Sequence, residues 1–378
     1  MTGLLKFLYC FSFLLLAACS GGGKNVIVEA LPDVPLRYAE NITLKDAGDY
    51  TVAVVRNPWD TTKVLHTYIL VPSDMEMPSD LPEGTVVRTP LESSLVYSSV
   101  HSSLISELGA DDAITGVCDA QYIHTPRLAE RIDSGIIADC GSGMSPNIER
   151  IIELQPQAIL LSPYENSGGY GKIEQLGIPL IECADYMETT PLGRAEWMKF
   201  YGMLYGRYDE AEKLFNETEH SYNSLKSAVD SIAHRPKVMM DKKYGQAWYV
   251  PGVNSIVTHY LNDAGGANPF SVNENRSGSI ALSPEQVLAG AQDADIWILR
   301  YNQADDMTLA SLSADDAIYS QFEPWKRGVV YGCNTNYSHY YEEVPFHPHW
   351  LLNDLMRVIH PELSLTNPDW PHYFSIIK

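Results

Sequence analysis

Aromatic and basic side chains recur in this chain at places where predicted strands end. Tyr164 and Tyr170 follow a predicted strand at 158–161, and Arg300 follows another at 295–299. Tyrosine and tryptophan supply large, stiff contact surfaces with a polar tip, which suit a broad, flat, partly polar ligand. Arginine adds a partner for carboxylate or phosphate groups. We therefore predict that the ligand-binding residues are Ser99, Tyr122, Ser142, Tyr164, Tyr170, Tyr244, Trp248, Arg276, Arg300, Tyr301, Tyr337 and Tyr340.

Each of these residues also has a simpler interpretation. A tyrosine in a loop can pack against its neighbours without meeting a ligand, and Arg276 and Arg300 can be ordinary surface arginines. The set of aromatic loops favours ligand binding more than any single member does.

Two glutamates form a second pattern with chemical consequences. The segments 145–161 and 283–299 both predict a helix start, a short helix and a buried strand, with Glu149 and Glu285 near the two helix starts. Apolar residues follow each glutamate at +2 and +3, and an alanine follows at +9. Building the same unit twice predicts two similar lobes, and a cleft between lobes is a preferred place for a ligand.

Local helix chemistry can also explain these glutamates. A carboxylate in the first helical turn complements the helix dipole by about 0.3–1 kcal/mol. Ser283 and Gln286 fit a capping box, in which each side chain bonds the backbone of the other residue. Capping and a functional role are compatible.

The motifs of several enzyme classes are missing from the sequence. It contains no Gly-x-Ser-x-Gly, no His-Glu-x-x-His and no P-loop. Histidines near predicted loops lack the His-x-x-x-His spacing of a metal site on a helix, and no cysteines form a Cys-x-x-Cys pair. We therefore predict a protein that is not an enzyme, has no cofactor and holds no metal through its own side chains.

The order of predicted elements positions these residues. Strands alternate with helices on both sides of one long helix, whose apolar stripe begins after Tyr208, and this order indicates α/β lobes with parallel sheets. The predicted fold is α/β, with two Rossmann-like lobes joined by a long α-helix and preceded by a β-rich extension. The predicted divisions are a signal peptide at 1–18, a lipidated tether at 19–33, a β-rich extension and connector at 34–84, an N-terminal lobe at 85–190, a helical linker at 191–235 and a C-terminal lobe at 236–378.

The N-terminus and the charge limit where the protein works. Residues 7–18 form an apolar run too short to span a bilayer, and Leu-Ala-Ala-Cys19 resembles a bacterial lipobox, so we expect cleavage before Cys19 and its lipidation. The alternative is an ordinary secretory signal. The formal charge of −22 disfavours nucleic acid as a partner.

Cys118 and Cys140 each end a predicted strand, and they are either a disulfide or isolated buried thiols.

Together these features resemble the substrate-binding lipoproteins of bacterial ABC importers for iron–siderophore, haem and vitamin B12 complexes. The likeness extends from about residue 85 to the C-terminus, and its matching pieces are 104–110, 114–117, 147–161, 176–179, 261–266 and 283–288.

The resemblance implies what the two glutamates and the aromatic loops would each contact. Glu149 and Glu285 would meet arginines of a dimeric membrane permease, one from each lobe. The aromatic loops would hold a metal chelate: a corrinoid, an iron–siderophore or a haem. The protein would be a monomer held to the membrane by its lipid, in the periplasm or cell envelope. Two other functions stay open, a surface capture or adhesion lipoprotein without a permease and an exported α/β hydrolase.

Overall fold

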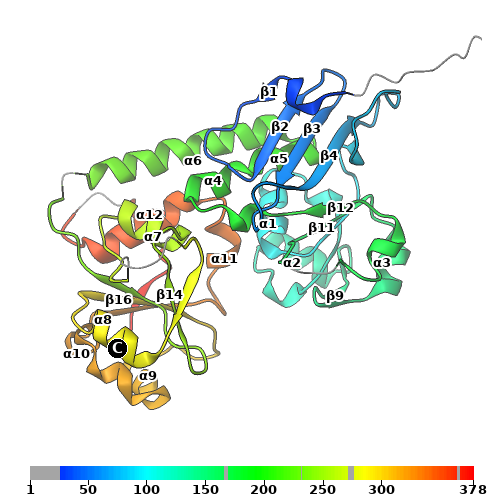
Figure 1. Cartoon of the computed structure of the whole chain (residues 1–378). Coiled ribbons are helices and arrows are strands. Elements are labelled where there is room, and N and C mark those ends of the chain that lie inside the picture. Colours follow the sequence, from blue (N-terminus) through cyan, green and yellow to red (C-terminus); the bar gives the residue numbers. More distant parts are fainter. Residues whose placement is uncertain (1–25, 166–168, 231, 271–275, 364–366) are drawn as a thin grey trace, which may run out of the picture.

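The chain folds into two α/β lobes and a small N-terminal sheet. The structure, a computed structural model, describes residues 26–165, 169–230, 232–270, 276–363 and 367–378. The expected signal peptide and Cys19 lie outside these residues. Helix α6 (Tyr208–Ala228) runs along one side of the molecule, with the C-terminal lobe at one end and the N-terminal lobe and sheet at the other (Figure 1). The expected two-lobed α/β fold is confirmed.

The β-rich extension is a five-stranded sheet in sequence order. Its strands are antiparallel except for β4 and β5, which are parallel. The sheet therefore includes residues beyond the boundary expected between 84 and 85. One face, with Val55 and Tyr68, is buried in the core of the N-terminal lobe. The strands are β1 (Asp33–Val34), β2 (Ile42–Asp46), β3 (Thr51–Arg56), β4 (Val64–Pro72) and β5 (Thr85–Thr89).

The N-terminal lobe is built on a parallel sheet with the order β12-β11-β6-β7-β8. Strand β6 ends at Val96, because the Ser98 side chain accepts a hydrogen bond from the Val100 N–H and starts a helix. Strands of the lobe are β6 (Ser94–Val96), β7 (Ile114–Val117), β8 (Ala138–Asp139), β11 (Ala158–Leu161) and β12 (Leu180–Glu182), with a hairpin of β9 (Gly141–Ser142) and β10 (Ser145–Pro146); its helices are α1 (Ser99–Glu107), α2 (Pro126–Asp133) and α3 (Ile148–Leu154).

Three helices form the linker, namely α4 (Pro191–Glu196), α5 (Met198–Leu204) and α6. The apolar stripe expected on the long helix is confirmed, since the buried side chains of α6 recur every three or four residues and lie on one face. They are Ala211, Phe215, Thr218, Tyr222 and Leu225.

The C-terminal lobe repeats the α/β plan with a smaller sheet of order β13-β16-β17-β18, whose last pair is antiparallel. Its strands are β13 (Val238–Met240), β16 (Ile296–Tyr301), β17 (Val330–Asn334) and β18 (Ser375–Ile376), with a hairpin of β14 (Trp248–Pro251) and β15 (Ser279–Leu282). Its helices are α7 (Ile256–Asp263), α8 (Pro284–Ala291), α9 (Leu309–Asp315), α10 (Glu323–Arg327), α11 (Tyr340–Glu343) and α12 (Pro348–Ile359).

A second connection between the lobes is residues 339–347, which we call the α11 strap. The Glu342 carboxylate accepts hydrogen bonds from the backbone N–H groups of His124 and Thr125, at 2.9 and 3.3 Å. Phe346 is 1% exposed and packs in the core of the N-terminal lobe. His347 Nε2 lies 2.8 Å from a carboxylate oxygen of Glu107 in α1. The lobes are thus fastened by the strap as well as by the linker.

The four cysteines in the described residues are free and buried. Cys118 and Cys140, which the sequence left open as a disulfide, are therefore separate thiols here. Burial raises the pKa of Cys118 to about 12 and that of Cys140 to about 11. Both thiols are protonated at neutral pH and are poor nucleophiles.

Trp248 corrects one of the predicted ligand residues. It is fully buried, and its ring packs against Trp297, Tyr319 and Phe322 at centroid distances of 5.6–5.8 Å. Its indole N–H donates to the Met240 carbonyl at 3.2 Å. Trp248 therefore belongs to the core of the C-terminal lobe and is closed to a ligand.

This placement predicts the effect of truncating Trp248. Trp248→Ala removes a fully buried ring and leaves a cavity, so we expect it to lower the free energy of unfolding of the C-terminal lobe by about 3–5 kcal/mol. Tyr249→Ala, on the same strand with its side chain 49% exposed, is the matched control and should change it by less than about 1 kcal/mol. Urea unfolding followed by circular dichroism measures both, and equal effects would contradict the assignment.

Candidate functional site

Both glutamates predicted to contact a permease lie at the same position of equivalent helices. Asn147 caps α3 and Ser283 caps α8, so that Glu149 and Glu285 are each the second helical residue, and both are exposed. The capping box of Ser283 and Gln286 is confirmed. Hydrogen bonding to the Ser283 hydroxyl lowers the pKa of Glu285, which is therefore ionised at neutral pH.

A hollow of about 530 Å³, which we call the N-lobe hollow, lies where strands β6, β7 and β11 end. Tyr164 and Tyr170, two of the predicted residues, line it together with Tyr97, Ser98 and Asp119. Ligands of parallel α/β sheets bind beyond the carboxyl ends of the strands, and this hollow occupies that place.

Another hollow of about 520 Å³ lies on the C-terminal lobe, and we call it the C-lobe hollow. The predicted residues Tyr301 and Tyr337 line it. The Tyr337 hydroxyl donates to the Ala304 carbonyl at 2.7 Å, and the Tyr301 hydroxyl accepts a hydrogen bond from the Met307 N–H at 3.1 Å. Both rings are thus oriented by their own loop.

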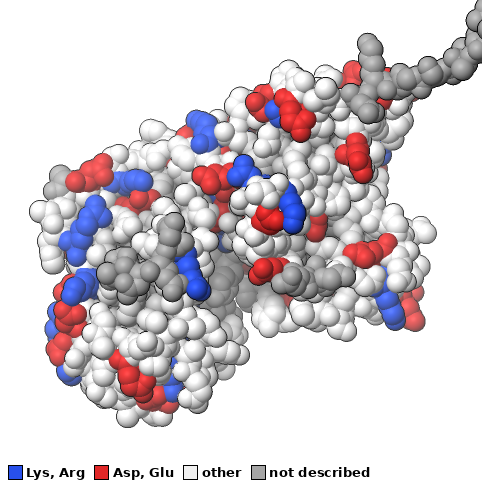
Figure 2. Space-filling model, in the orientation of Figure 1, with Lys and Arg blue, Asp and Glu red and all other residues white. Residues whose placement is uncertain are grey.

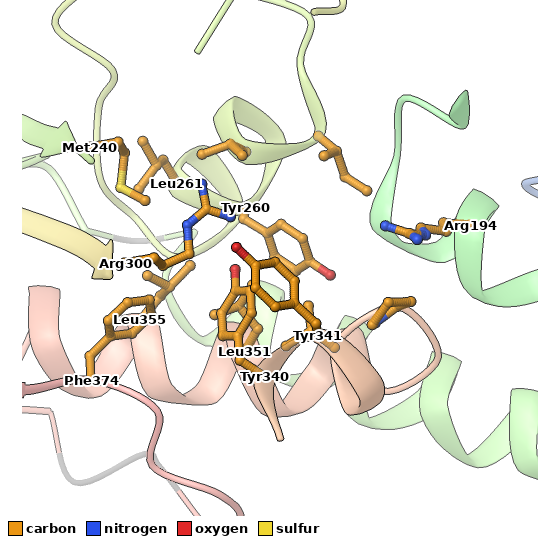
Figure 3. A pocket seen from close by; sticks show the side chains of 14 residues that line it. Arg194, Met240, Tyr260, Leu261, Arg300, Tyr340, Tyr341, Leu351, Leu355 and Phe374 are labelled. Carbon is orange, nitrogen blue, oxygen red and sulfur yellow. The ribbon is translucent and has the colours of Figure 1, made fainter. Parts of the chain in front are cut away.

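A smaller and more enclosed space lies where the C-terminal lobe meets Arg194 of α4. This cavity of about 120 Å³, the arginine cavity, contains the predicted residues Arg300 and Tyr340. Figure 3 shows Arg194 and Arg300 on opposite sides of it, with the rings of Tyr260, Tyr340 and Tyr341 between them. Its other lining residues are Met240, Ile256, Val257, Leu261, Val344, Pro345, Leu351, Leu355 and Phe374.

Arg300 is held in the cavity by a carboxylate. Its Nε and Nη2 atoms both donate to Asp241, with a distance of 3.0 Å for Nε. Burial alone would lower the pKa of this guanidinium, but Asp241, Tyr340 and Tyr341 hold that pKa well above its ordinary value. Burial raises the pKa of Tyr340 to about 12, and Arg300 partly offsets this increase, so the phenol is neutral.

Arg194 is held from behind by Asp185, which is fully buried and begins the short 3-10 helix that follows β12. One Asp185 oxygen accepts from Arg194 Nε at 3.1 Å, and the other lies 2.7 Å from His101 Nε2 and accepts from the Tyr201 hydroxyl at 2.8 Å. Burial would raise the pKa of Asp185, but His101, Arg194 and Tyr201 lower it to about 2. A buried carboxylate thus joins α1, α4 and α5 beside the cavity.

Other predicted residues do not line these three spaces. Ser99 is the first residue of α1, and its neighbour Ser98 takes the place in the N-lobe hollow. Trp248 is buried in the core, and the remaining ones are exposed: Tyr122, Ser142, Tyr244 and Arg276. Each of the three spaces therefore contains only two of the predicted residues. These pairs are Tyr164 with Tyr170, Tyr301 with Tyr337, and Arg300 with Tyr340.

Sequence reasoning missed Arg194 and Tyr260. Arg194 lies inside α4 and Tyr260 inside α7, whereas the predicted ligand residues follow the ends of predicted strands. An arginine within an otherwise apolar helical segment, Pro-Leu-Gly-Arg-Ala, was the available signal for Arg194.

Acidic and basic side chains are mixed over the surface. Figure 2 shows them interspersed on both lobes and also beside the gap between the lobes. Within the described residues, no group of three or more His, Cys, Asp or Glu side chains is arranged to hold a metal ion. The same part of the chain has no helix that is long and apolar enough to cross a bilayer.

Comparisons with known proteins agree with this geometry. A family model described as periplasmic binding protein matches residues 96–336. An uncharacterised lipoprotein of Methanocaldococcus jannaschii is 28% identical over 286 residues, which are 73% of this chain and 67% of the relative.

Two solved structures share the fold. The apo periplasmic haem-binding protein of Roseiflexus sp. RS-1 has a TM-score of 0.57 at 18% identity and covers 71% of this chain and 98% of its own. The molybdate-bound periplasmic binding protein of Haemophilus influenzae has a TM-score of 0.58 at 14% identity and covers 73% and 88%.

The low pKa of Asp185 predicts a pH dependence. Its folded pKa of about 2 lies below the ordinary 3.8, so the ionised form adds about 2 kcal/mol to the free energy of unfolding above pH 4, and this is lost as pH falls from about 4 to 2. Asp185→Asn should therefore be less stable than wild type at pH 7, with the difference shrinking below pH 4. The exposed Asp112→Asn is the control, and a difference between Asp185→Asn and wild type that does not change with pH would contradict this prediction.

Proposed function

The chain belongs to the periplasmic binding protein family, and from this membership we propose that it is the substrate-binding lipoprotein of an ABC importer. In this proposal it captures a metal chelate between its lobes and delivers it to a membrane permease. The family is described as binding proteins, and in this proposal the chain binds its cargo without catalysing a reaction.

The observation that carries the proposal is the arrangement of tyrosines and arginines around the lobes. The N-lobe hollow contributes Tyr164 and Tyr170, and the arginine cavity contributes Arg300 and Tyr340. Aromatic walls with a few placed polar groups suit a broad ligand with a polar edge. A corrinoid, an iron–siderophore and a haem all have this form, and in each the chelator supplies the metal's ligands.

The two fastenings between the lobes favour a small closing motion. Helix α6 and the α11 strap both cross from one lobe to the other, and moving the lobes far apart would expose Phe346 and break the hydrogen bonds to Glu342. Burial of this kind restricts hinge motion, so the cargo would be held by a nearly preformed site.

Delivery would use the matched glutamates. Glu149 and Glu285 project from the first turns of α3 and α8, one on each lobe, and two such charges can fix a single orientation on a dimeric permease. Lipidation of Cys19 would keep the protein at the membrane, in agreement with the lipoprotein name of the relative.

Titration with hemin, cyanocobalamin and a ferric siderophore tests the capture step. We expect one of the three to bind with a change in its absorbance spectrum, and Tyr164→Ala to weaken that binding about tenfold, because it removes one aromatic wall. Tyr208→Ala, at the start of α6, lines none of the three spaces and should bind like wild type. Absence of binding to all three ligands would refute the chelate proposal.

Charge reversal tests the delivery step. In vesicles containing the cognate importer, Glu149→Lys and Glu285→Lys together should reduce uptake at least tenfold while cargo binding is unchanged, because the reversed charges would repel arginines of the permease. Glu153→Lys, on the same helix as Glu149 and also exposed, is the matched control. Full uptake by the double variant would contradict the docking role.

A further inference from the structure

The polar side chains of the arginine cavity are positively charged or neutral. Its 14 lining residues include two arginines and three tyrosines, and the other nine have apolar side chains. No aspartate, glutamate, asparagine, glutamine, serine or threonine belongs to the lining. A guanidinium can only donate hydrogen bonds, whereas a neutral phenol can donate one and also accept. The positive charge and the excess of donors favour a ligand whose polar part accepts hydrogen bonds.

The Arg194 guanidinium has hydrogen-bond donors that no described residue uses. Its Nε is used by Asp185, and its two Nη atoms have no hydrogen-bond partner among the described residues. The side chain is 22% exposed, so it is neither sealed in the protein nor open to bulk solvent. Asp185 therefore fixes the guanidinium from behind and leaves its far edge for a ligand.

Arg300 mirrors this arrangement from the other side of the cavity (Figure 3). Asp241 engages Nε and Nη2, and within the described part of the chain Nη1 has no partner. The two carboxylates hold the arginines in place and offset their mutual repulsion, so an acid can approach both without a large rearrangement.

Tyrosine hydroxyls add to the same set. Those of Tyr260, Tyr340 and Tyr341 have no hydrogen-bond partner among the described residues, although Tyr260 is 5% and Tyr340 8% exposed. Burial raises the pKa of both of these side chains, so they are neutral donors. None of these hydroxyl oxygens is among the buried polar atoms of the described residues that lack a hydrogen-bond partner, so solvent reaches them and a ligand oxygen could take the place of water.

The apolar side chains of the cavity indicate that the rest of the ligand is apolar as well. Residues such as Ile256, Leu351 and Phe374 would be left facing water by a small inorganic oxyanion, whereas a hydrocarbon or aromatic body would cover them. A volume of about 120 Å³ holds one arm of a molecule and not a whole chelate.

We propose that the arginine cavity binds an apolar arm of the cargo that ends in an acidic oxygen group, such as a carboxylate, placed between Arg194 and Arg300. This rests on the proposed function and narrows it, because a cargo without an acidic arm would leave both guanidinium edges unpaired. A cationic arm would be repelled by both arginines. Arg194 is then a specificity-determining residue, and Asp185 is its positioning residue.

The test uses two small probes of the same shape, 3-phenylpropionate and its neutral amide, 3-phenylpropanamide. Calorimetric titration of the mature chain should show the acid binding at least tenfold more tightly than the amide. Arg194→Met should reduce acid binding at least tenfold and leave amide binding nearly unchanged. Arg56→Met, an exposed arginine of β3 in the N-terminal sheet, is the control and should bind both probes like wild type.

Equal affinity of the wild type for the acid and the amide would overturn the proposal, and this comparison needs no variant. Unchanged acid binding by a folded Arg194→Met variant would also overturn it. The proposed function fails separately: if a chelate binds but the acid is not preferred, only the acidic arm is refuted. Preference for the acid without binding of any chelate would support the cavity and refute the chelate.

Discussion

The buried carboxylate of Asp185 is the interaction on which the arrangement between the lobes depends. It begins the short 3-10 helix that follows β12. Its oxygens contact His101 of α1, Arg194 of α4 and Tyr201 of α5. Removing one partner of a buried, hydrogen-bonded charge leaves the other uncompensated, which is far more costly than losing a surface ion pair. The first lobe, the linker and the cavity wall therefore share one electrostatic anchor.

The α11 strap connects this anchor to ligand binding. Tyr340 and Tyr341 face the arginine cavity, the adjacent Glu342 is hydrogen-bonded to the backbone of the N-terminal lobe, and Phe346 packs near His101 and Tyr201, with ring centroids 6.3 and 5.9 Å away. The same short segment thus forms part of the binding cavity and part of the joint between lobes.

The features that could be predicted from the sequence are those that depend on hydrophobic periodicity and on local residue chemistry. The buried stripe of α6, the alternation of strands and helices, and the capping of α8 by Ser283 follow from spacing and residue type alone. The burial of Trp248 did not follow, because the aromatic pattern predicted a ligand-binding loop at this residue, whereas it lies in β14 and faces the core. Arg194 was missed for a different reason: its importance comes from Asp185 and from Tyr260, which approach it only in the folded chain.

The structure of the protein with the cargo that copurifies from its native host is the most direct measurement of the central claim. A metal chelate should lie between the lobes, with an acidic oxygen within hydrogen-bonding distance of both Arg194 and Arg300. A copurifying ligand without a metal, or a chelate that leaves the arginine cavity empty, would contradict it.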